Sequence, residues 1–388
     1  MTITFPGPLH VGEGEAGHWQ YHARTLGMSR PLLVTGALLR ESAMFAHLFG
    51  DPPDGPCRVT DSHEPTFGGA VAGADQYRDE GCDGIVAFGG GGRLDLAKVI
   101  RALVQYDADD LLARFFDEGG VVPMPKTQIP LLCLPTTAGS GSEVSRGAVI
   151  YDQTTGRKRL LAGPGMVATA SILDPLVLKA MPVTLRAITT IDAFSHALEV
   201  LASTGSHPLA VPLARQAAST IIRWSRPFIT ATEWDESFGA EGARELMLAS
   251  SMAAMGFAKG LGLAHALAHG IGSVTDVPHG YAIGIVLPHV IQYNDDKSRG
   301  LDAYVSVSLE MTSQLGWIQT SHGAGAVISD WIRRLFSYAH LEARLSDVGV
   351  TVEQLPAIVQ CAMKDHCLRT TPVPCDENDV MNVLGRAF

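Results

Sequence analysis

The stretch from Gly260 to Asn294 constrains the fold most, because it places His265, His269 and His279 in a largely apolar run. His265 and His269 are four residues apart, so on an α-helix their imidazoles lie on one face. His279 follows a Val-Pro break at which the chain can turn back towards them. Nitrogen donors grouped in apolar surroundings predict a metal site.

A second pair with the same spacing lies upstream, in IDAFSHALEVLAS, where Asp192 and His196 are again four residues apart. One such histidine alone is commonly an ordinary core or surface residue, whereas two matched pairs together with His279 favour a site. A mixed set of carboxylate and imidazole donors suits Fe, Zn, Mn or Co better than Mg or Ca, which prefer oxygen ligands.

The length of 388 residues exceeds the size at which one core stops growing, so two domains are expected. A net charge of −11 argues against a nucleic-acid partner or an anionic membrane surface, and favours small-molecule chemistry.

No apolar segment approaches the ~20 residues of a membrane-spanning helix, and the N-terminal stretch lacks the pattern of a secretory leader. We therefore expect a cytoplasmic protein. Its six cysteines show no CxxC spacing, which agrees with a reducing compartment.

Short aliphatic runs alternate with helical patterns through the first half of the chain. The expected strands span residues 31–36, 57–62, 84–90, 129–137 and 170–175, and a hairpin joins 147–152 to 157–163. Alternation of this kind predicts a mostly parallel, doubly wound α/β sheet. After Met181-Pro182 the strand signals end and Ala/Leu-rich helical sequence follows, so we place an α/β domain at residues 1–185 and an all-α domain at 186–388.

A run of glycines follows the expected strand 84–90 and precedes a helix, in GIVAFGGGGRLDLAK. Glycines let the backbone approach a pyrophosphate, and the helix N-terminus offers unpaired N–H groups to hold it. The spacing differs from GxGxxG, so a tight turn without ligand is the alternative. LPTTAGSGSEVS adds hydroxyl groups at the end of the next buried strand, where they can bind a cofactor or simply belong to a connecting loop.

Together these stretches resemble the iron-containing alcohol dehydrogenase family over nearly the whole chain. The resemblance is carried by GGGGRLDLAK, LPTTAGSGSEVS, DAFSHALEV and HALAHGIG with PHG, in the family's order and near its spacing. It implies an N-terminal dinucleotide-binding α/β domain and a C-terminal helical domain that holds one divalent metal, with Fe(II) favoured and Zn as the alternative. It also implies a homodimer.

The resemblance also assigns residues. His269 matches a histidine close to the nicotinamide and substrate, so it is assigned to proton relay or positioning. The implied metal ligands are Asp192, His196, His265 and His279. The implied cofactor contacts are Gly89, Gly90 and Gly91 in the turn, Asp95 and Lys98 in the helix, Thr136, Thr137 and Ser145 in the hydroxyl loop, and Lys158.

The choice between NAD and NADP depends on Gly36, which stands where many members of the family carry an Asp. A carboxylate there binds the adenosine ribose and repels a 2′-phosphate, so its absence removes a barrier to NADP. Glu64, where Asn is common, is a carboxylate that partly restores the discrimination. The frequency of NAD as the cofactor of members of this family favours NAD slightly.

The implied reaction is reversible hydride transfer between a nicotinamide cofactor and a small primary alcohol or its aldehyde. One alternative is a metal-free reductase similar to maleylacetate reductase, against which the complete ligand set argues. Another is a lyase similar to the sugar-phosphate cyclases, which needs several basic residues near the metal, where only Lys259 occurs. A third is a nucleotide-binding sensor without catalysis.

Overall fold

The computed structural model describes residues 5–51, 55–60, 65–106, 111, 121–125, 127–231, 238–298, 301–316 and 323–388. The chain forms two compact units: Met1–Thr137 with Gly141–Ala180, and Ala138–Ser140 with Met181–Phe388. The boundary expected between residues 185 and 186 falls a few residues after Ala180.

The first unit contains a six-stranded parallel sheet in the order β1-β8-β5-β4-β2-β3. The strands are β1 (Leu9–Val11), β2 (Pro31–Gly36), β3 (Cys57–Thr60), β4 (Gly84–Gly89), β5 (Leu131–Pro135) and β8 (Ala170–Leu173). Every residue of β4 and β5 is buried, as their continuous apolar sequence predicts. The confirmed fold class is α/β for this unit.

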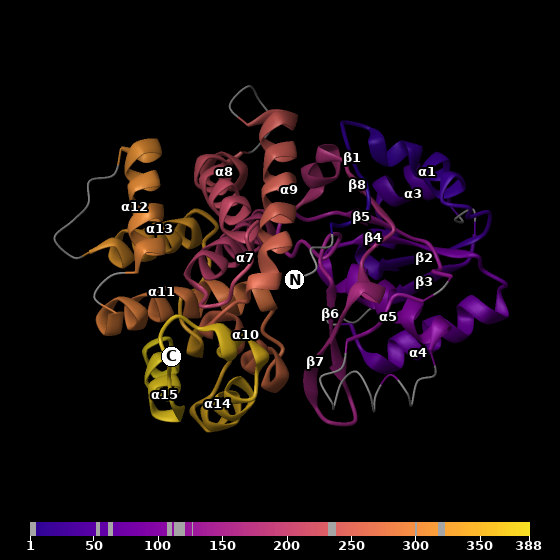
Figure 1. Ribbon diagram of the computed structural model, residues 1–388. Coiled ribbons are helices and arrows are strands. Elements are labelled where there is room, and N and C mark those ends of the chain that lie inside the picture. Colours follow the sequence, from indigo (N-terminus) through magenta and orange to yellow (C-terminus); the bar gives the residue numbers. More distant parts are fainter. Residues whose placement is uncertain are drawn as a thin grey trace. The chain divides into compact units, whose positions relative to one another are not determined.

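Helices cover both faces of this sheet (Figure 1). They are α1 (Trp19–Thr25), α2 (Ala37–Arg40), α3 (Ala43–Phe49), α4 (Phe67–Asp79) and α5 (Gly91–Gln105), with short 3-10 turns η1 (Glu15–His18), η3 (Pro164–Met166) and η4 (Pro175–Ala180). The antiparallel pair β6 (Gly147–Asp152) and β7 (Arg157–Ala162) is the hairpin that the sequence predicts.

The strand order reverses between β2 and β4. From β2 the chain moves outward to β3 and then returns to the other side of β2, continuing through β4, β5 and β8. In open α/β sheets ligands bind outside the carboxyl ends of the strands at such a switch point. Gly36 ends β2 and Gly89 ends β4, so both border it.

The edge strand β1, which is only three residues long, is not among the strands that the sequence predicts. After β2 the chain forms two short helices, α2 and α3, rather than one long helix. Ser42 separates them, because its Oγ accepts a hydrogen bond from the Phe45 N–H at 3.1 Å and so caps a new helix. Residues 61 and 62 of the expected strand 57–62, and Glu64, lie outside the described residues.

The second unit is helical, and its described residues contain no strand. Its α-helices are α7 (Val183–Ala202), α8 (Ala210–Thr230), α9 (Gly239–Met255), α10 (Leu263–Val274), α11 (His279–Ser298), α12 (Asp302–Leu315), α13 (Ala324–Tyr338), α14 (Leu355–Met363) and α15 (Glu377–Arg386). The 3-10 turns are η5 (Gly256–Lys259), η6 (Ser346–Val348), η7 (Val352–Gln354) and η8 (His366–Thr370). The helix α11 packs against both α7 and α10.

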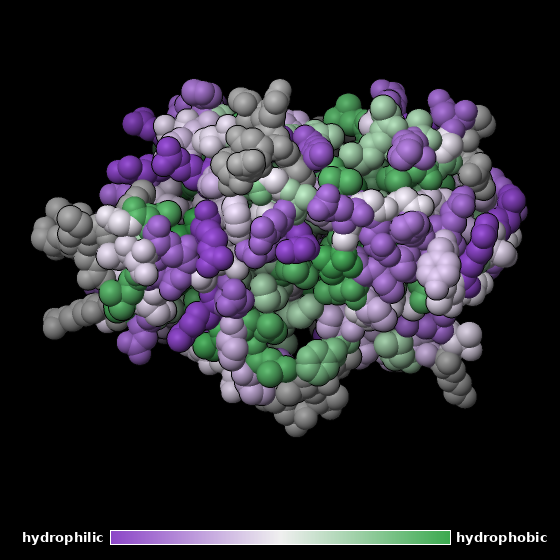
Figure 2. All heavy atoms as spheres, turned by 90° about the horizontal axis from the view of Figure 1, so that it is seen from above, coloured by the Kyte–Doolittle hydropathy of each residue, from purple (hydrophilic) through white to green (hydrophobic). Residues whose placement is uncertain are grey.

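Among the described residues no single helix has the length and apolar composition to cross a membrane; Gly239–Lys259 with Leu263–Val274, bent by 100°, passes that test only as a pair. The face drawn in Figure 2 mixes hydrophilic and hydrophobic residues.

Lys259 caps the C-terminal end of α7, and its side chain is buried. Its ammonium donates to the carbonyl oxygens of Val200 at 2.7 Å and Ser203 at 2.5 Å. Carbonyls in the last turn of a helix have no hydrogen-bond partner within the helix and carry the negative end of its dipole. A cation at this position supplies the missing hydrogen bonds and balances the negative charge.

We expect Lys259→Met to lower the free energy of unfolding by about 1–3 kcal/mol, because hydrogen bonds from a charged donor are lost and the carbonyls stay buried. Urea denaturation measures the change. Lys364→Met at an exposed position is the matched control and should stay within about 0.5 kcal/mol of the parent. An equal effect of both substitutions would contradict the capping role.

Candidate functional site

The helix α7 carries three acidic or imidazole side chains on one face. Asp192, His196 and Glu199 follow the spacing i, i+4, i+7, which brings them into line along a helix. All three are buried, with 6%, 5% and 7% of their surface exposed. The spacing along the sequence predicted the first two as site residues but not Glu199, although Glu199 lies on the same helical face.

Two further helices bring their histidines to this face. His265 lies in the first turn of α10 and is 2% exposed, while His279 is the first residue of α11 rather than part of a turn. Gly280 allows this approach: a Cβ there would lie 2.9 Å from the Ile188 carbonyl oxygen and 3.5 Å from Asp192 Cβ. The glycine of the PHG motif therefore lets the start of α11 meet α7.

The separations between these side chains match those of ligands around one ion. Asp192 Oδ1 lies 3.7 Å from His196 Nε2 and 3.7 Å from His279 Nε2, which is too long for a hydrogen bond. Ligands bound at 2.0–2.2 Å in a tetrahedral shell are about 3.4 Å apart. Asp192, His265 and His279 each offer a donor atom within 4.8 Å of the others. The His196 and His265 rings stack with centroids 4.6 Å apart.

Among the described residues, the buried side chains Asp192, His196 and His265 have no positive charge beside them that balances the carboxylate. Asp192 Oδ1 and His265 Nε2 are buried and accept or donate no hydrogen bond. Burial raises the pKa of Asp192 to about 7. Burial, and then the neighbouring imidazoles, lower the pKa of His196 and His265 well below the ordinary histidine value, so both rings are neutral and present lone pairs. A buried carboxylate oxygen and a buried imidazole nitrogen without hydrogen-bond partners, beside a second neutral imidazole, fit a divalent cation.

Glu199 holds the imidazole of His265 in place. Its Oε2 lies 2.5 Å from His265 Nδ1, and its Oε1 accepts from the Ala264 N–H at 2.8 Å. With Nδ1 engaged, Nε2 is the ring atom left to face the metal position. Burial raises the pKa of Glu199 to about 7. Carboxylates that hold the second nitrogen of a ligating histidine in this way fix its tautomer and orientation.

His269 lies beside the ligand group and is oriented by a residue that is distant in the chain. Its Nδ1 is 2.8 Å from Asp365 Oδ2, and its ring centroid is 5.2 Å from that of His279 and 6.1 Å from that of His265. Burial acts to raise the pKa of Asp365, but the charge and hydrogen bond of His269 outweigh it and hold that pKa well below its usual range. No pattern in the sequence pointed to Asp365.

The predicted nucleotide turn lies between β4 and α5 at the switch point. Gly89 has φ 159°, and a Cβ there would lie 2.6 Å from Arg93 Cγ, so only glycine fits. The Thr136 N–H donates to the Gly89 carbonyl oxygen at 3.0 Å, and the Thr137 methyl lies 3.4 Å from the Cβ position of Gly90. These contacts bring the glycine turn and the start of the hydroxyl loop together.

Other predicted cofactor residues make contacts within the protein. Lys98 is 0% exposed, and its Nζ donates to Ser145 Oγ at 3.0 Å and to the Gly147 carbonyl oxygen at 2.8 Å. Asp95 accepts from Ser142 Oγ at 2.5 Å and from the Val149 N–H at 2.9 Å. Both residues thus tie the loop after β5 to α5.

Lys158 lies on β7 opposite Tyr151 and is half-buried. Direct contacts of Asp95, Lys98, Ser145 and Lys158 with a cofactor stay predictions.

Comparison with known proteins identifies relatives over the whole chain. The family profile described as "Iron-containing alcohol dehydrogenase" matches residues 6–175, and "Fe-containing alcohol dehydrogenase family, C-terminal" matches 186–388. The "Probable alcohol dehydrogenase EutG" of Escherichia coli K12 is 32% identical and covers 100% of this chain and 94% of its own.

Two more distant relatives agree with these matches. The "Lactaldehyde reductase" of Escherichia coli K12 is 27% identical and covers 97% of each chain. A crystal structure of a 1,3-propanediol oxidoreductase superposes with a TM-score of 0.86 at 26% identity, covering 100% of this chain and 99% of that one.

We expect Glu199→Gln to weaken metal binding about 10- to 100-fold, because the amide holds His265 Nδ1 less firmly than the carboxylate does. Metal content after dialysis against graded chelator concentrations measures the effect. The control is Glu245→Gln in the same unit, where the carboxylate accepts a hydrogen bond from the Trp224 indole. This variant should bind metal as tightly as the parent does. Unchanged retention in Glu199→Gln would refute the orienting role.

Proposed function

The chain belongs to the iron-containing alcohol dehydrogenase family and is an oxidoreductase, and we propose that it interconverts a small primary alcohol and its aldehyde with NADP as the hydride carrier. The observation that carries this proposal is the buried donor set, in which Asp192 Oδ1 and His265 Nε2 have no hydrogen-bond partner. A divalent metal supplies the charge that this set lacks.

The proposed metal ligands are Asp192, His196, His265 and His279. A cation held by them would polarise the oxygen of the alcohol or aldehyde. The packing of α7 and α10 buries Asp192, His196 and His265, which strengthens the electrostatic interactions among them. The family's name favours iron, and the imidazole-rich set also accommodates Zn.

His269 is proposed to carry the proton of the reaction. Its Nδ1 is held by Asp365, so Nε2 is the atom that exchanges a proton with the alcohol or with solvent. The ionised Asp365 stabilises the positive charge that forms on the ring when it takes up the proton. Asp365 is therefore a positioning residue that acts through His269.

Two observations in the first unit support NADP rather than NAD, against the lean from family frequency. Gly36 ends β2 without a carboxylate, and the Arg93 side chain lies beside it, with Nε 3.1 Å from the Cβ position of Gly36. Both residues border the switch point where the adenosine end of a dinucleotide lies in such sheets, and an arginine there accommodates a 2′-phosphate.

The alternatives receive less support. A metal-free reductase leaves the buried donor set without a charge to balance it. A cyclase-type lyase needs basic residues for its substrate, and Lys259 is held by carbonyl oxygens at the end of α7. A homodimer in the cytoplasm, with no nucleic-acid or membrane partner, remains our expectation.

The function is tested by assaying short aldehydes with NADPH and NADH on protein stripped of metal and reloaded with Fe, Zn, Mn or Co. We expect reduction only after reloading, and faster with NADPH. His265→Ala should lose metal and rate together, and a variant that keeps both would contradict the ligand assignment.

We expect Arg93→Ala to weaken binding of adenosine 2′,5′-bisphosphate about tenfold to a hundredfold, the effect of losing a charged hydrogen bond. Binding of adenosine 5′-monophosphate should stay unchanged, because it lacks the 2′-phosphate. Isothermal titration calorimetry measures both without turnover. Arg24→Ala, at an exposed residue of α1, is the control. Equal weakening of the two ligands would overturn the NADP assignment.

We expect Asp365→Asn to lower kcat about tenfold or more while metal content stays the same, because His269 loses its orienting charge. His269→Gln should lower kcat at least as far. A double variant no slower than His269→Gln alone would show that Asp365 acts through His269. Loss of metal in Asp365→Asn would contradict the proposal that Asp365 acts only on proton transfer by His269.

A further inference from the structure

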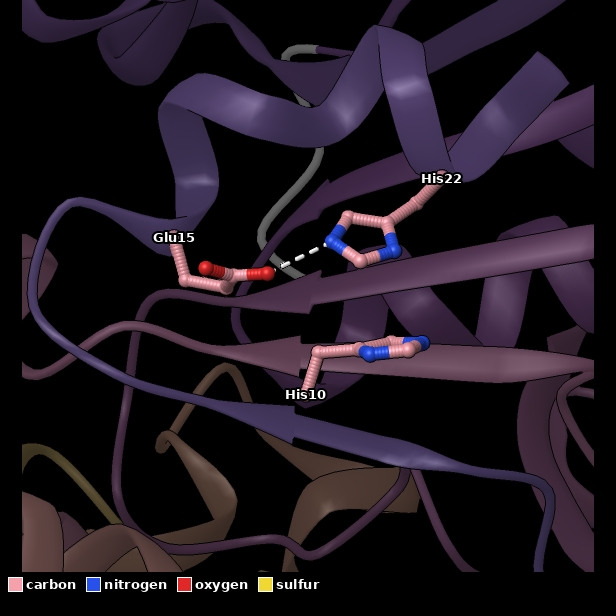
Figure 3. Close-up of side chains that lie close together, drawn as sticks. All are labelled: His10, Glu15 and His22. Atoms are coloured by element: carbon pink, nitrogen blue, oxygen red, sulfur yellow. Dashed lines mark hydrogen bonds and ion pairs between the residues drawn. The ribbon is translucent and has the colours of Figure 1, made fainter. Parts of the chain in front are cut away.

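A second group of metal-ligating side chains lies in the first unit, among residues that the reaction does not use. His10 from β1, Glu15 from η1 and His22 from α1 converge, as Figure 3 shows. Each offers one donor atom, and these atoms lie within 4.8 Å of one another. Glu15 Oε1 is 2.6 Å from His22 Nε2, and the His10 and His22 rings have centroids 3.9 Å apart.

The protonation states of His10 and Glu15 suit the binding of a cation. Burial, and then the neighbouring His22, lower the pKa of His10, against a smaller opposite effect of Glu15, so its ring is neutral at neutral pH. The hydrogen bond with His22 lowers the pKa of Glu15, so its carboxylate is ionised. Two imidazoles and one carboxylate are the donors found in three-ligand zinc sites that keep one position open for water.

The backbone holds the three residues in place. β1 is the edge strand and pairs in parallel with β8, with His10 opposite Ile172. Gly14, with φ 76°, makes the turn into η1, and the Ala16 N–H donates to the buried Asp174 at 3.1 Å. His22 is 7% exposed, whereas the Glu15 side chain is 27% exposed, which leaves access from solvent on the carboxylate side.

We propose that His10, Glu15 and His22 form a second site for a divalent transition-metal cation, with Zn²⁺ as the best match to its donors. The ion would join the edge strand β1 to α1 and so stabilise the N-terminal part of the sheet. Binding needs only local movement. The distance between Glu15 Oε1 and His22 Nε2 would increase from 2.6 Å to about 3.4 Å, the separation of two ligand atoms on one ion, and the stacked rings of His10 and His22 would move apart.

The nearby His18 provides a matched control. It lies four residues before His22, and its Nδ1 is 3.3 Å from Glu15 Oε2, but its side chain is 69% exposed and it is not part of the converging group. Replacing it removes an imidazole from the same segment without removing a proposed ligand.

The experiment is a Zn²⁺ titration of the full chain after chelator treatment, followed by calorimetry and by metal analysis after gel filtration. We expect two equivalents per chain in the parent and in His18→Gln, and one in His10→Gln and Glu15→Gln, because each of these two variants lacks one of the three donors. His10 and Glu15 are not fully buried, so these variants avoid the core defect that His22→Gln would bring.

The same titration separates this site from the proposed catalytic one. His265→Ala should lose the other equivalent together with activity, whereas His10→Gln should keep activity. Added Zn²⁺ should raise the melting temperature of His265→Ala but not of a variant that also carries His10→Gln. One equivalent in the parent, or two equivalents in both His10→Gln and Glu15→Gln, would overturn the proposal.

Discussion

The arrangement of the second unit depends on one electrostatic constraint, which is that the Asp192 carboxylate is buried among neutral imidazoles without a hydrogen bond to Oδ1. Removing a charge from water costs several kcal/mol unless a partner compensates it. Here the protein supplies no compensating cation of its own among the described neighbours of this carboxylate. Three helices meet at it, and Gly280 permits their close approach.

Buried cations elsewhere in the chain show the opposite arrangement. Lys98 and Lys259 are also buried, but each donates to carbonyl or hydroxyl oxygens of neighbouring loops and helix ends. The charges of these two lysines are therefore balanced by hydrogen bonds within the protein. The Asp192 carboxylate oxygen has no such partner in the described part of the chain, and a buried polar atom left unpaired in this way requires an explanation.

Acidic side chains hold two of the imidazoles in the second unit. Glu199 contacts His265 and Asp365 contacts His269, each through one ring nitrogen. In the first unit the glycine turn, Thr136 and Arg93 meet at the switch point of the sheet.

Local pattern was enough to predict the α/β and helical halves, the hairpin, the glycine turn and the helical pair Asp192 and His196, because period and spacing along the chain are local properties. The spacing also indicated His265, His269 and His279 as a group of donors, and the resemblance to the family separated the two predicted ligands from His269. Only the tertiary structure decided that Asp365 orients His269 from 96 residues away, that Arg93 lies beside Gly36, and that His10 meets His22. Such contacts depend on how strands and helices pack, and packing joins residues whose separation in the sequence carries no signal.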